Sequence, residues 1–244
     1  MEKYEVVYFY DDKNNFMTSV SLFSFLINQK NLSKINVNII VDGKTNKNNL
    51  ISLSKKFNIE FNYVVGKPSL LYLQDLLSCE KVLYLSNTTI VLDDLTELFE
   101  TKFDENYAGV LDFNINNQSI NNKYICTDVC ILNLKQIREH NLTKIYKQCG
   151  NNLNDQQLIN LKNKDNYILK LRYNYWNCVM NNEKKMIQFS KLFNLKEYNY
   201  IKIFNTQYNF AILNYVGGQE PWKTTTKYYE IWKKYYDLYQ SLLK

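Results

Sequence analysis

The chain has 244 residues and a formal net charge of +6, from 30 Lys and Arg against 24 Asp and Glu. No stretch reaches the roughly 18 apolar residues of a membrane span, and residues 1–10 are too charged for a secretory signal peptide. We therefore expect a cytoplasmic protein that buries a sizeable core. Nucleic-acid binding is not expected, because base readout depends on arginine and the only arginines are Arg138 and Arg172.

The first half of the chain alternates strand-like apolar runs with helical patterns. The predicted strands are Glu5–Phe9, Ile35–Val41, Glu60–Val65 and Lys81–Leu85. The predicted helices are Met17–Gln29, Asn46–Phe57, Ser69–Leu77 and Asp93–Phe99. Alternation at this spacing is typical of βαβ units, so we predict an α/β protein with a largely parallel sheet.

The second half is less regular. Its predicted strands are Tyr107–Leu111 and Tyr124–Leu132, and its predicted helices are Lys135–Gln148 and Asn154–Lys162. No internal repeat and no Pro- or Gly-rich linker interrupts the sequence. We therefore predict one domain over residues 1–222, followed by a C-terminal helix over residues 223–244.

The C-terminal helix is amphipathic and aromatic, with Ile231, Tyr235, Leu238 and Leu242 in one stripe. A basic, aromatic helix can lie on the inner face of an anionic membrane, where lipid-linked acceptors reside. The same pattern also suits a helix that packs on its own domain or across a homodimer. Both interpretations remain open at this stage.

The soft metal ligands are few and scattered. The cysteines are Cys79, Cys126, Cys130, Cys149 and Cys178, with no CxxC pair among them. A zinc site needs clustered N and S ligands, so none is predicted, and the thiols are expected to be reduced. His140 stands at the polar end of a predicted helix, which argues against a catalytic role.

Four stretches, taken in order, resemble family 8 glycosyltransferases, the group that includes glycogenin and bacterial lipopolysaccharide galactosyl- and glucosyltransferases. They are Val7–Asp12, Lys81–Leu85 with the residues that follow it, Tyr124–Val129 with Asp155–Gln156, and Asn214–Trp222. The resemblance implies the GT-A, Rossmann-like fold of nucleotide-diphospho-sugar transferases, with a mixed, mostly parallel central sheet.

The resemblance also implies an activity, namely retaining transfer of a hexose from a UDP-sugar to a glycan or lipid-linked acceptor. It assigns catalytic roles to Asp155 and Gln156. It assigns contacts with the nucleotide-sugar to Tyr10, Asp11, Asp12, Ser86, Asn87, Thr88, Cys126, Thr127, Asp128, Asn214, Gly217, Glu220 and Lys223.

The chain departs from the family at its metal-binding positions. In the family, an Asp-x-Asp pair and a late His hold a divalent ion on the diphosphate, and a late Lys adds a positive charge. Here the Asp-x-Asp reads Ser86-Asn87-Thr88, the His is Asn214 and the Lys is Glu220. Hydroxyls and amides are poor substitutes as ligands of Mn²⁺ or Mg²⁺, so we predict no metal cofactor.

Several of these residues have a structural alternative. Asp11 and Asp12 can form a turn or contact the nucleotide, and Asn154 or Asp155 can cap the next helix. Gly217, with Pro221 and Trp222 beyond it, can be an architectural turn or a phosphate loop.

Three charged side chains allow two interpretations each. Lys223 and Arg172 could neutralise a diphosphate, or could be a solvated lysine and an ion-paired arginine. Asp128 could hold a sugar hydroxyl or could block the sugar pocket. For the whole chain, the alternative to an enzyme is a non-catalytic relative that acts as a partner or scaffold in glycan assembly.

Overall fold

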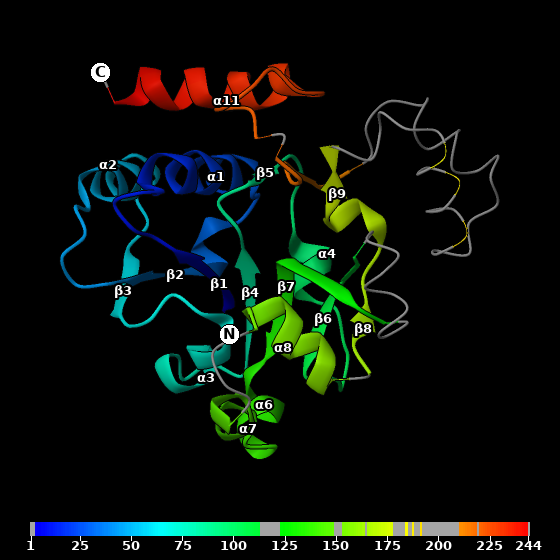
Figure 1. Cartoon of the computed structure of the whole chain (residues 1–244). Coiled ribbons are helices and arrows are strands. Elements are labelled where there is room, and N and C mark those ends of the chain that lie inside the picture. The colour runs from blue at the N-terminus through cyan, green and yellow to red at the C-terminus, as the bar shows by residue number, and fades with distance from the viewer. Residues whose placement is uncertain are drawn as a thin grey trace.

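The computed structural model describes residues 3–112, 123–148, 153–163, 165–177, 210–218 and 220–243, with the single positions 184, 187 and 191. Within them, a seven-stranded sheet is sandwiched between helices (Figure 1). Its strands, in spatial order, are β3 (Phe61–Val65), β2 (Ile35–Val41), β1 (Tyr4–Phe9), β4 (Lys81–Leu85), β7 (Ile125–Asn133), β6 (Tyr107–Leu111) and β8 (Tyr167–Ile168).

The sheet is mixed but mostly parallel. Strand β1 pairs in parallel with β2 and β4, β2 with β3, and β6 with β8, whereas β7 runs antiparallel to both β4 and β6. This arrangement confirms the predicted α/β fold with a largely parallel sheet. The central strands β4, β7 and β6 are largely buried, which explains why they read as apolar runs, whereas β3 at the edge of the sheet is partly exposed.

A second, three-stranded sheet was not foreseen from the sequence. It consists of β5 (Thr89–Val91), β10 (Ile212–Asn214) and β9 (Tyr175–Trp176), with β10 in the middle. Strand β10 pairs antiparallel to β5, so that Asn214 stands opposite Thr89. Because such short strands pair over long sequence distances, local patterns carry almost no signal for them.

The helices lie on both faces of the large sheet. They are α1 (Asn15–Asn28), α2 (Asn48–Phe57), α3 (Leu73–Leu76), α4 (Thr96–Phe99), α6 (Leu134–Glu139), α7 (Leu142–Gln148), α8 (Asp155–Lys162) and α11 (Tyr229–Leu242). Single 3-10 turns are η1 (Leu32–Lys34), η2 (Leu70–Tyr72) and η3 (Leu171–Tyr173). The predicted helix over 135–148 is divided into α6 and α7, because Asn141 between them takes a left-handed conformation with φ of 56°.

Two hydrophobic cores hold these layers together. Alternate residues of β1 point to opposite faces of the sheet: Val6 and Tyr8 enter the core beneath α1 and α11, whereas Val7 enters the core beneath α3. Figure 1 shows α1 and α2 on one side of the sheet, with α11 beyond them, and α3, α6 and α7 on the other side.

Helix α11 packs on α1 within the first core. Its buried side chains are Trp232, Tyr235 and Tyr239, and the Tyr235 hydroxyl accepts a hydrogen bond from Asn28 Nδ2 at 2.9 Å. The predicted stripe differs in one respect, because Leu238 is 41% exposed. The large rings turn the helix so that they face the core, since an aromatic ring buries more surface than leucine.

The structure thus shows α11 packed on its own domain, which is one of the interpretations that its sequence allows. Membrane contact and dimer formation through the same helix stay predictions. No helix in the described part of the chain combines the length and the apolar character that crossing a membrane would require.

We expect Trp232→Ala to destabilise the protein by about 3–5 kcal/mol, because it empties a buried site between Phe16, Trp222 and Tyr236. The matched control is Leu238→Ala on the exposed side of the same helix, which should cost less than about 1 kcal/mol. Urea denaturation measures both. Equal costs would contradict the packing of α11 on the domain.

Candidate functional site

Three segments that are distant in sequence meet where β4 ends. The loop Ser86–Thr88 follows β4 directly, Asp128 lies on the neighbouring strand β7, and Asn214 ends β10. The backbone N–H of Ser86 donates to the carbonyl oxygen of Asp128 at 2.9 Å, which fixes the loop against β7. In open α/β sheets, ligands bind in the crevice at the carboxyl ends of the parallel strands, and β4 is parallel to β1.

The side chains of these segments form one hydrogen-bonded group. The hydroxyls of Ser86 and Thr88 are 2.7 Å apart, and Thr88 Oγ1 donates to Asn214 Oδ1 at 2.7 Å. Asn214 Nδ2 in turn donates to Asp128 Oδ2 and to Asn174 Oδ1, both at 2.9 Å. The name polar cluster is used below for Ser86, Thr88, Cys126, Asp128, Asn174 and Asn214.

The polar cluster is largely inaccessible to solvent. Asn174 and Asn214 are fully buried and Ser86 is 6% exposed, whereas Thr88 and Asp128 are partly buried. Buried polar groups are costly unless they are hydrogen-bonded, so the internal bonds explain how such a group is tolerated. Asn174 was not predicted as a site residue, because it lies in an irregular segment between η3 and β9 that carries no motif.

Asp128 is the only carboxylate of the polar cluster. Burial raises the pKa of its side chain, and the hydrogen bonds from Asn214 and from Cys126 Sγ, at 3.6 Å, oppose that rise. No described Lys or Arg forms an ion pair with it. The ionised form of Asp128 is therefore stabilised by neutral donors rather than by a cation.

This donor set does not fit a divalent ion of the family type. Asn214 presents amide hydrogens to Asp128, and its amide oxygen is already engaged by Thr88. The other oxygens are the single carboxylate of Asp128, the amide oxygen of Asn174 and two hydroxyls, and the first two already accept hydrogen bonds from Asn214. One carboxylate with weak neutral ligands is a poor site for Mn²⁺ or Mg²⁺. Within the described residues, no group of three or more His, Cys, Asp or Glu could hold a metal ion.

Helix α1 supports both the loop that follows β4 and strand β5. Ser21 Oγ donates to the carbonyl oxygen of Ser86 at 3.2 Å, and Ser24 Oγ accepts from the backbone N–H of Val91 at 2.9 Å. Asn28 Nδ2 donates to the Val91 carbonyl oxygen at 2.9 Å. These three side chains recur at helical spacing, so they form a polar stripe on the buried face of α1, which an analysis of apolar periodicity cannot detect.

Asp155 links two segments of the chain. Its Oδ1 accepts from Ser69 Oγ at 3.1 Å, and its Oδ2 accepts from the backbone N–H of Leu70 at 2.7 Å. The N-cap of α8 is Asn154, which forms a reciprocal capping box with Gln157. Of the two capping alternatives, the structure therefore shows Asn154, and Asp155 anchors η2 to the start of α8.

Gln156 is held at both ends of its amide. Its Oε1 accepts from the backbone N–H of Thr127 at 3.0 Å, and its Nε2 donates to Asp112 Oδ2 at 2.8 Å. Thr127 lies between Cys126 and Asp128, so this bond connects α8 to the polar cluster through β7. The side chain of Gln156 is partly buried and has a fixed orientation.

The predicted nucleotide-contacting residues after β1 make contacts within the protein. Tyr10 is 2% exposed and lies in the core beneath α1, where burial raises its pKa to about 12. Asp11 accepts from the backbone N–H of Asn14 at 2.7 Å, and Asp12 accepts from the backbone N–H of Asn46 at 3.0 Å. Asp11 therefore forms a local turn, whereas Asp12 ties the segment after β1 to the segment that precedes α2. Contact of either residue with a nucleotide stays a prediction.

The late loop combines a turn with an ion pair. Gly217 and Gly218 have φ angles of 74° and 78°, which lie in the left-handed region and favour glycine. Trp222 packs against Trp232 of α11 with ring centroids 6.2 Å apart, which supports an architectural role for the turn. Glu220 Oε1 lies 3.5 Å from Nζ of the exposed Lys223.

The other polar residues singled out from the sequence lie outside the polar cluster. Arg172 pairs with Asp93 at 2.6 Å and with Glu97 at 3.6 Å, as the ion-pair alternative predicted. His140 is exposed, with its Nδ1 2.9 Å from Asn106 Oδ1. Asn87 is partly buried between Ser86 and Thr88.

Three cysteines can be placed. Cys79, Cys126 and Cys130 are free thiols, and Cys126 belongs to the polar cluster. Cys149 and Cys178 lie outside the described residues.

Comparison with solved structures identifies the fold. The chain is similar to the galactosyltransferase LgtC, solved with donor and acceptor sugar analogues, at a TM-score of 0.71 and 17% identity, over 98% of this chain and 96% of that one. It is similar to the glycosyltransferase GlyE of Streptococcus pneumoniae TIGR4 at a TM-score of 0.75 and 16% identity. This match covers 100% of this chain and 62% of GlyE. It also resembles the bifunctional glycosyltransferase WbbM at a TM-score of 0.74 and 19% identity, over 96% of this chain and 49% of WbbM.

These likenesses confirm the GT-A glycosyltransferase fold. The chain spans nearly all of LgtC but less than two thirds of GlyE and about half of WbbM. No protein-family model and no curated protein sequence matches the chain.

We expect the stability difference between the wild type and Asp128→Asn to depend on pH. Burial raises the folded-state pKa of Asp128 above that of the unfolded chain. Between the unfolded-state and folded-state pKa values, the folded protein binds more protons than the unfolded chain. The free energy of unfolding of the wild type, relative to that of Asp128→Asn, therefore falls as pH rises through this range and stays at the lower value above both pKa values. The measurement is urea denaturation of both proteins from acidic to neutral pH.

A control for the loss of a negative charge is Asp104→Asn at an exposed position. The pH dependence of its free energy of unfolding gives the effect of removing a surface charge. This effect is subtracted from that of Asp128→Asn. A wild type that gains stability relative to Asp128→Asn on going from acidic to neutral pH would contradict the burial of this carboxylate.

We expect Asp155→Ala to destabilise the protein by about 1–3 kcal/mol, because it leaves the Ser69 hydroxyl and the Leu70 N–H without their acceptor. Asn154→Ala, which removes the N-cap of the same helix, should cost about 1 kcal/mol. Thermal and urea unfolding give both values. An Asp155→Ala protein of unchanged stability that has lost UDP-sugar turnover would instead indicate a catalytic carboxylate.

Proposed function

We propose that this protein belongs to glycosyltransferase family 8 and transfers a hexose from a UDP-sugar to a glycan or lipid-linked acceptor, with retention of configuration. The observation that carries the proposal is the convergence of three of the four resembling stretches. Thr88 binds Asn214, Ser86 binds the Asp128 backbone and Gln156 binds Thr127, all at one end of β4 and β7. The GT-A fold, which the chain shares with LgtC over nearly all of both chains, supports the same proposal.

Gln156 is proposed as the residue nearest to the reacting carbon, where the resemblance puts it. The bonds to Thr127 and Asp112 fix both ends of its amide before substrate arrives. An oriented amide oxygen can stabilise the positive charge that develops on the sugar, without any reorganisation during the reaction. Asp155 is proposed to hold η2 beside it, through the bonds to Ser69 and Leu70.

Donor binding is proposed to be independent of a divalent ion. The metal-binding positions carry Ser86, Thr88 and Asn214, which bond to one another and to Asp128. We propose that their hydroxyl and amide groups contact the donor directly as neutral hydrogen-bonding groups. Lys223, which is exposed and only 3.5 Å from Glu220, is the cation of this loop that could approach the diphosphate.

The alternative, a non-catalytic partner or scaffold in glycan assembly, is favoured by a specific observation. Glu220 stands where the resemblance expects the Lys that faces the diphosphate, and like charges repel. Asp128 stands where the resemblance expects the sugar, and its side chain could block that pocket. The hydrogen bonds of the polar cluster are also made within the protein, so donor groups would have to displace them.

We expect UDP-glucose or UDP-galactose to bind with the same Kd in EDTA and in millimolar Mn²⁺, because the polar cluster offers no suitable ligands for the ion. Calorimetric titration in the two buffers measures this, and a UDP-release assay measures turnover. Gln156→Ala should abolish UDP release while the donor still binds.

The matched variant is Thr88→Val, which keeps the shape of the side chain and removes its hydroxyl. A gain of affinity with Mn²⁺ that Thr88→Val abolishes would refute metal independence. Absence of binding by any UDP-sugar in either buffer would favour the non-catalytic alternative.

A further inference from the structure

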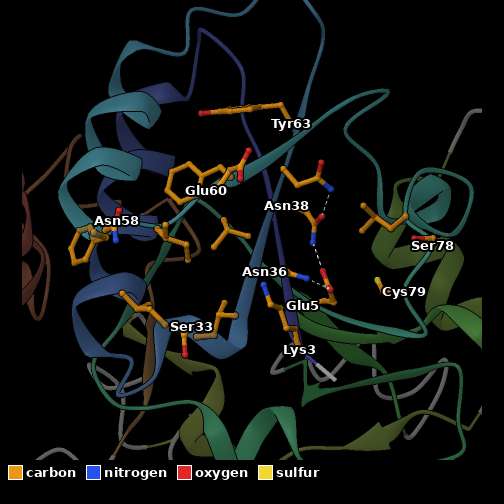
Figure 2. A pocket seen from close by; sticks show the side chains of 18 of the residues that line it. Lys3, Glu5, Ser33, Asn36, Asn38, Asn58, Glu60, Tyr63, Ser78 and Cys79 are labelled. Carbon is orange, nitrogen blue, oxygen red and sulfur yellow. Dashed lines mark hydrogen bonds between the residues drawn. The ribbon is translucent and has the colours of Figure 1, made fainter. Parts of the chain in front are cut away.

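A pocket of about 980 Å³ opens at the edge of the sheet opposite to the polar cluster (Figure 2). Its lining comes from the first residues of β1, β2 and β3 and from the segments that precede β2, β3 and β4. Because these strands are parallel, the pocket lies at their amino ends, whereas the polar cluster lies at the carboxyl end of β4. The two sites are therefore separate.

The floor of the pocket is polar where the face of a parallel sheet is normally apolar. Asn36 Nδ2 donates to Glu5 Oε1 and Asn38 Nδ2 to Glu5 Oε2, both at 2.7 Å, and Asn62 Nδ2 donates to Asn38 Oδ1 at 2.8 Å. Figure 2 shows Glu5, Asn36 and Asn38 close together, with dashed lines for the hydrogen bonds that join them. Asparagine is disfavoured in strands, and three of them on one face leave polar groups where apolar side chains would otherwise pack.

The row of Glu5, Asn36, Asn38 and Asn62 has hydrogen-bonding capacity left over. Asn36 and Asn62 each use one amide hydrogen in the row, and the carboxylate of Glu5 can accept more bonds than the two it receives. Glu5 and Asn36 are partly buried and Asn62 is exposed, so a ligand in the pocket can reach all three. The volume is in the range of small-molecule sites, roughly 300–1,000 Å³.

The charges restrict the class of ligand. Glu5 is the charged member of the row and has no ion-pair partner among the described Lys and Arg side chains, so an anionic ligand would be repelled. A cationic ligand would be attracted by Glu5 and by Glu60, which also lines the pocket, but the ammonium group of Lys3 in the same lining opposes it. The ring of Tyr63 is already approached by Lys47 Nζ, which lies 4.8 Å from its centroid. A neutral ligand with many hydroxyls can both donate to Glu5 and accept from the amides.

The pocket also offers apolar surface beside the polar row. Leu77 lines the wall that leads into β4, and Tyr63 lines the wall at β3. Sugar rings combine hydroxyls at their edges with apolar C–H faces, which matches this mixture of amides, a carboxylate and apolar side chains. We propose that the pocket is a carbohydrate-binding site that holds a neutral glycan segment, independently of the candidate active site.

The test is calorimetric titration with three neutral probes, maltotetraose, cellotetraose and chitotetraose. We expect at least one of them to bind, and Asn36→Ala and Asn62→Ala each to weaken it by about tenfold, the equivalent of one lost hydrogen bond. The matched control is Asn48→Ala, an exposed asparagine on α2 outside the pocket, which should leave Kd unchanged. Thermal unfolding verifies that each variant is folded.

Further experiments distinguish binding in this pocket from binding in the candidate active site, and a neutral glycan from charged ligands. UDP at saturating concentration should not displace the oligosaccharide, and Gln156→Ala should not affect its binding, whether or not the protein is a transferase. No binding of the three probes at millimolar concentration, or equal binding by all variants, would overturn the proposal. Preferential binding of spermine or of glucose 6-phosphate, lost in the same two variants, would overturn the neutral class of ligand.

Discussion

The side-chain amide of Asn214 is the interaction on which the candidate site depends. It receives a hydrogen bond from Thr88 and donates to Asp128 and Asn174, so one residue joins four segments of the chain. A fully buried amide has to satisfy its hydrogen bonds within the protein, and this requirement fixes the positions of its partners. The small sheet has a matching register, in which Asn214 of β10 stands opposite Thr89 of β5, next to its partner Thr88.

The same requirement explains why the site is supported from both sides of the sheet. On one face of the sheet, Ser21 of α1 bonds to Ser86 and Ser24 bonds to Val91 of β5. On the opposite face, Gln156 of α8 bonds to Thr127 of β7. Rigid helices and strands therefore hold the loop after β4 in position, as is common for loops that carry catalytic or binding residues.

The two ends of the parallel strands have different chemistry. At the carboxyl end of β4, the polar cluster uses neutral groups and one buried carboxylate, Asp128. At the amino ends of β1 to β3, a row of amides extends from Glu5 to Asn62. Both arrangements rely on asparagine, whose amide donates and accepts at once and so can connect strands without a net charge. The abundance of this residue in the chain thus has structural consequences at both edges.

The sequence by itself determined the class of fold and the order of its main elements, because βαβ periodicity and short motifs are local signals. The resemblance of its motifs also singled out Ser86, Thr88, Asp128 and Asn214, which the structure brings together, although it gave none of the bonds between them. Only the tertiary structure decided that Asp155 anchors η2, that α11 turns Leu238 outward, and that a second sheet exists. These features depend on pairings between residues far apart in the chain, and the free energy of such contacts is set by burial and hydrogen-bond satisfaction, which no local pattern records.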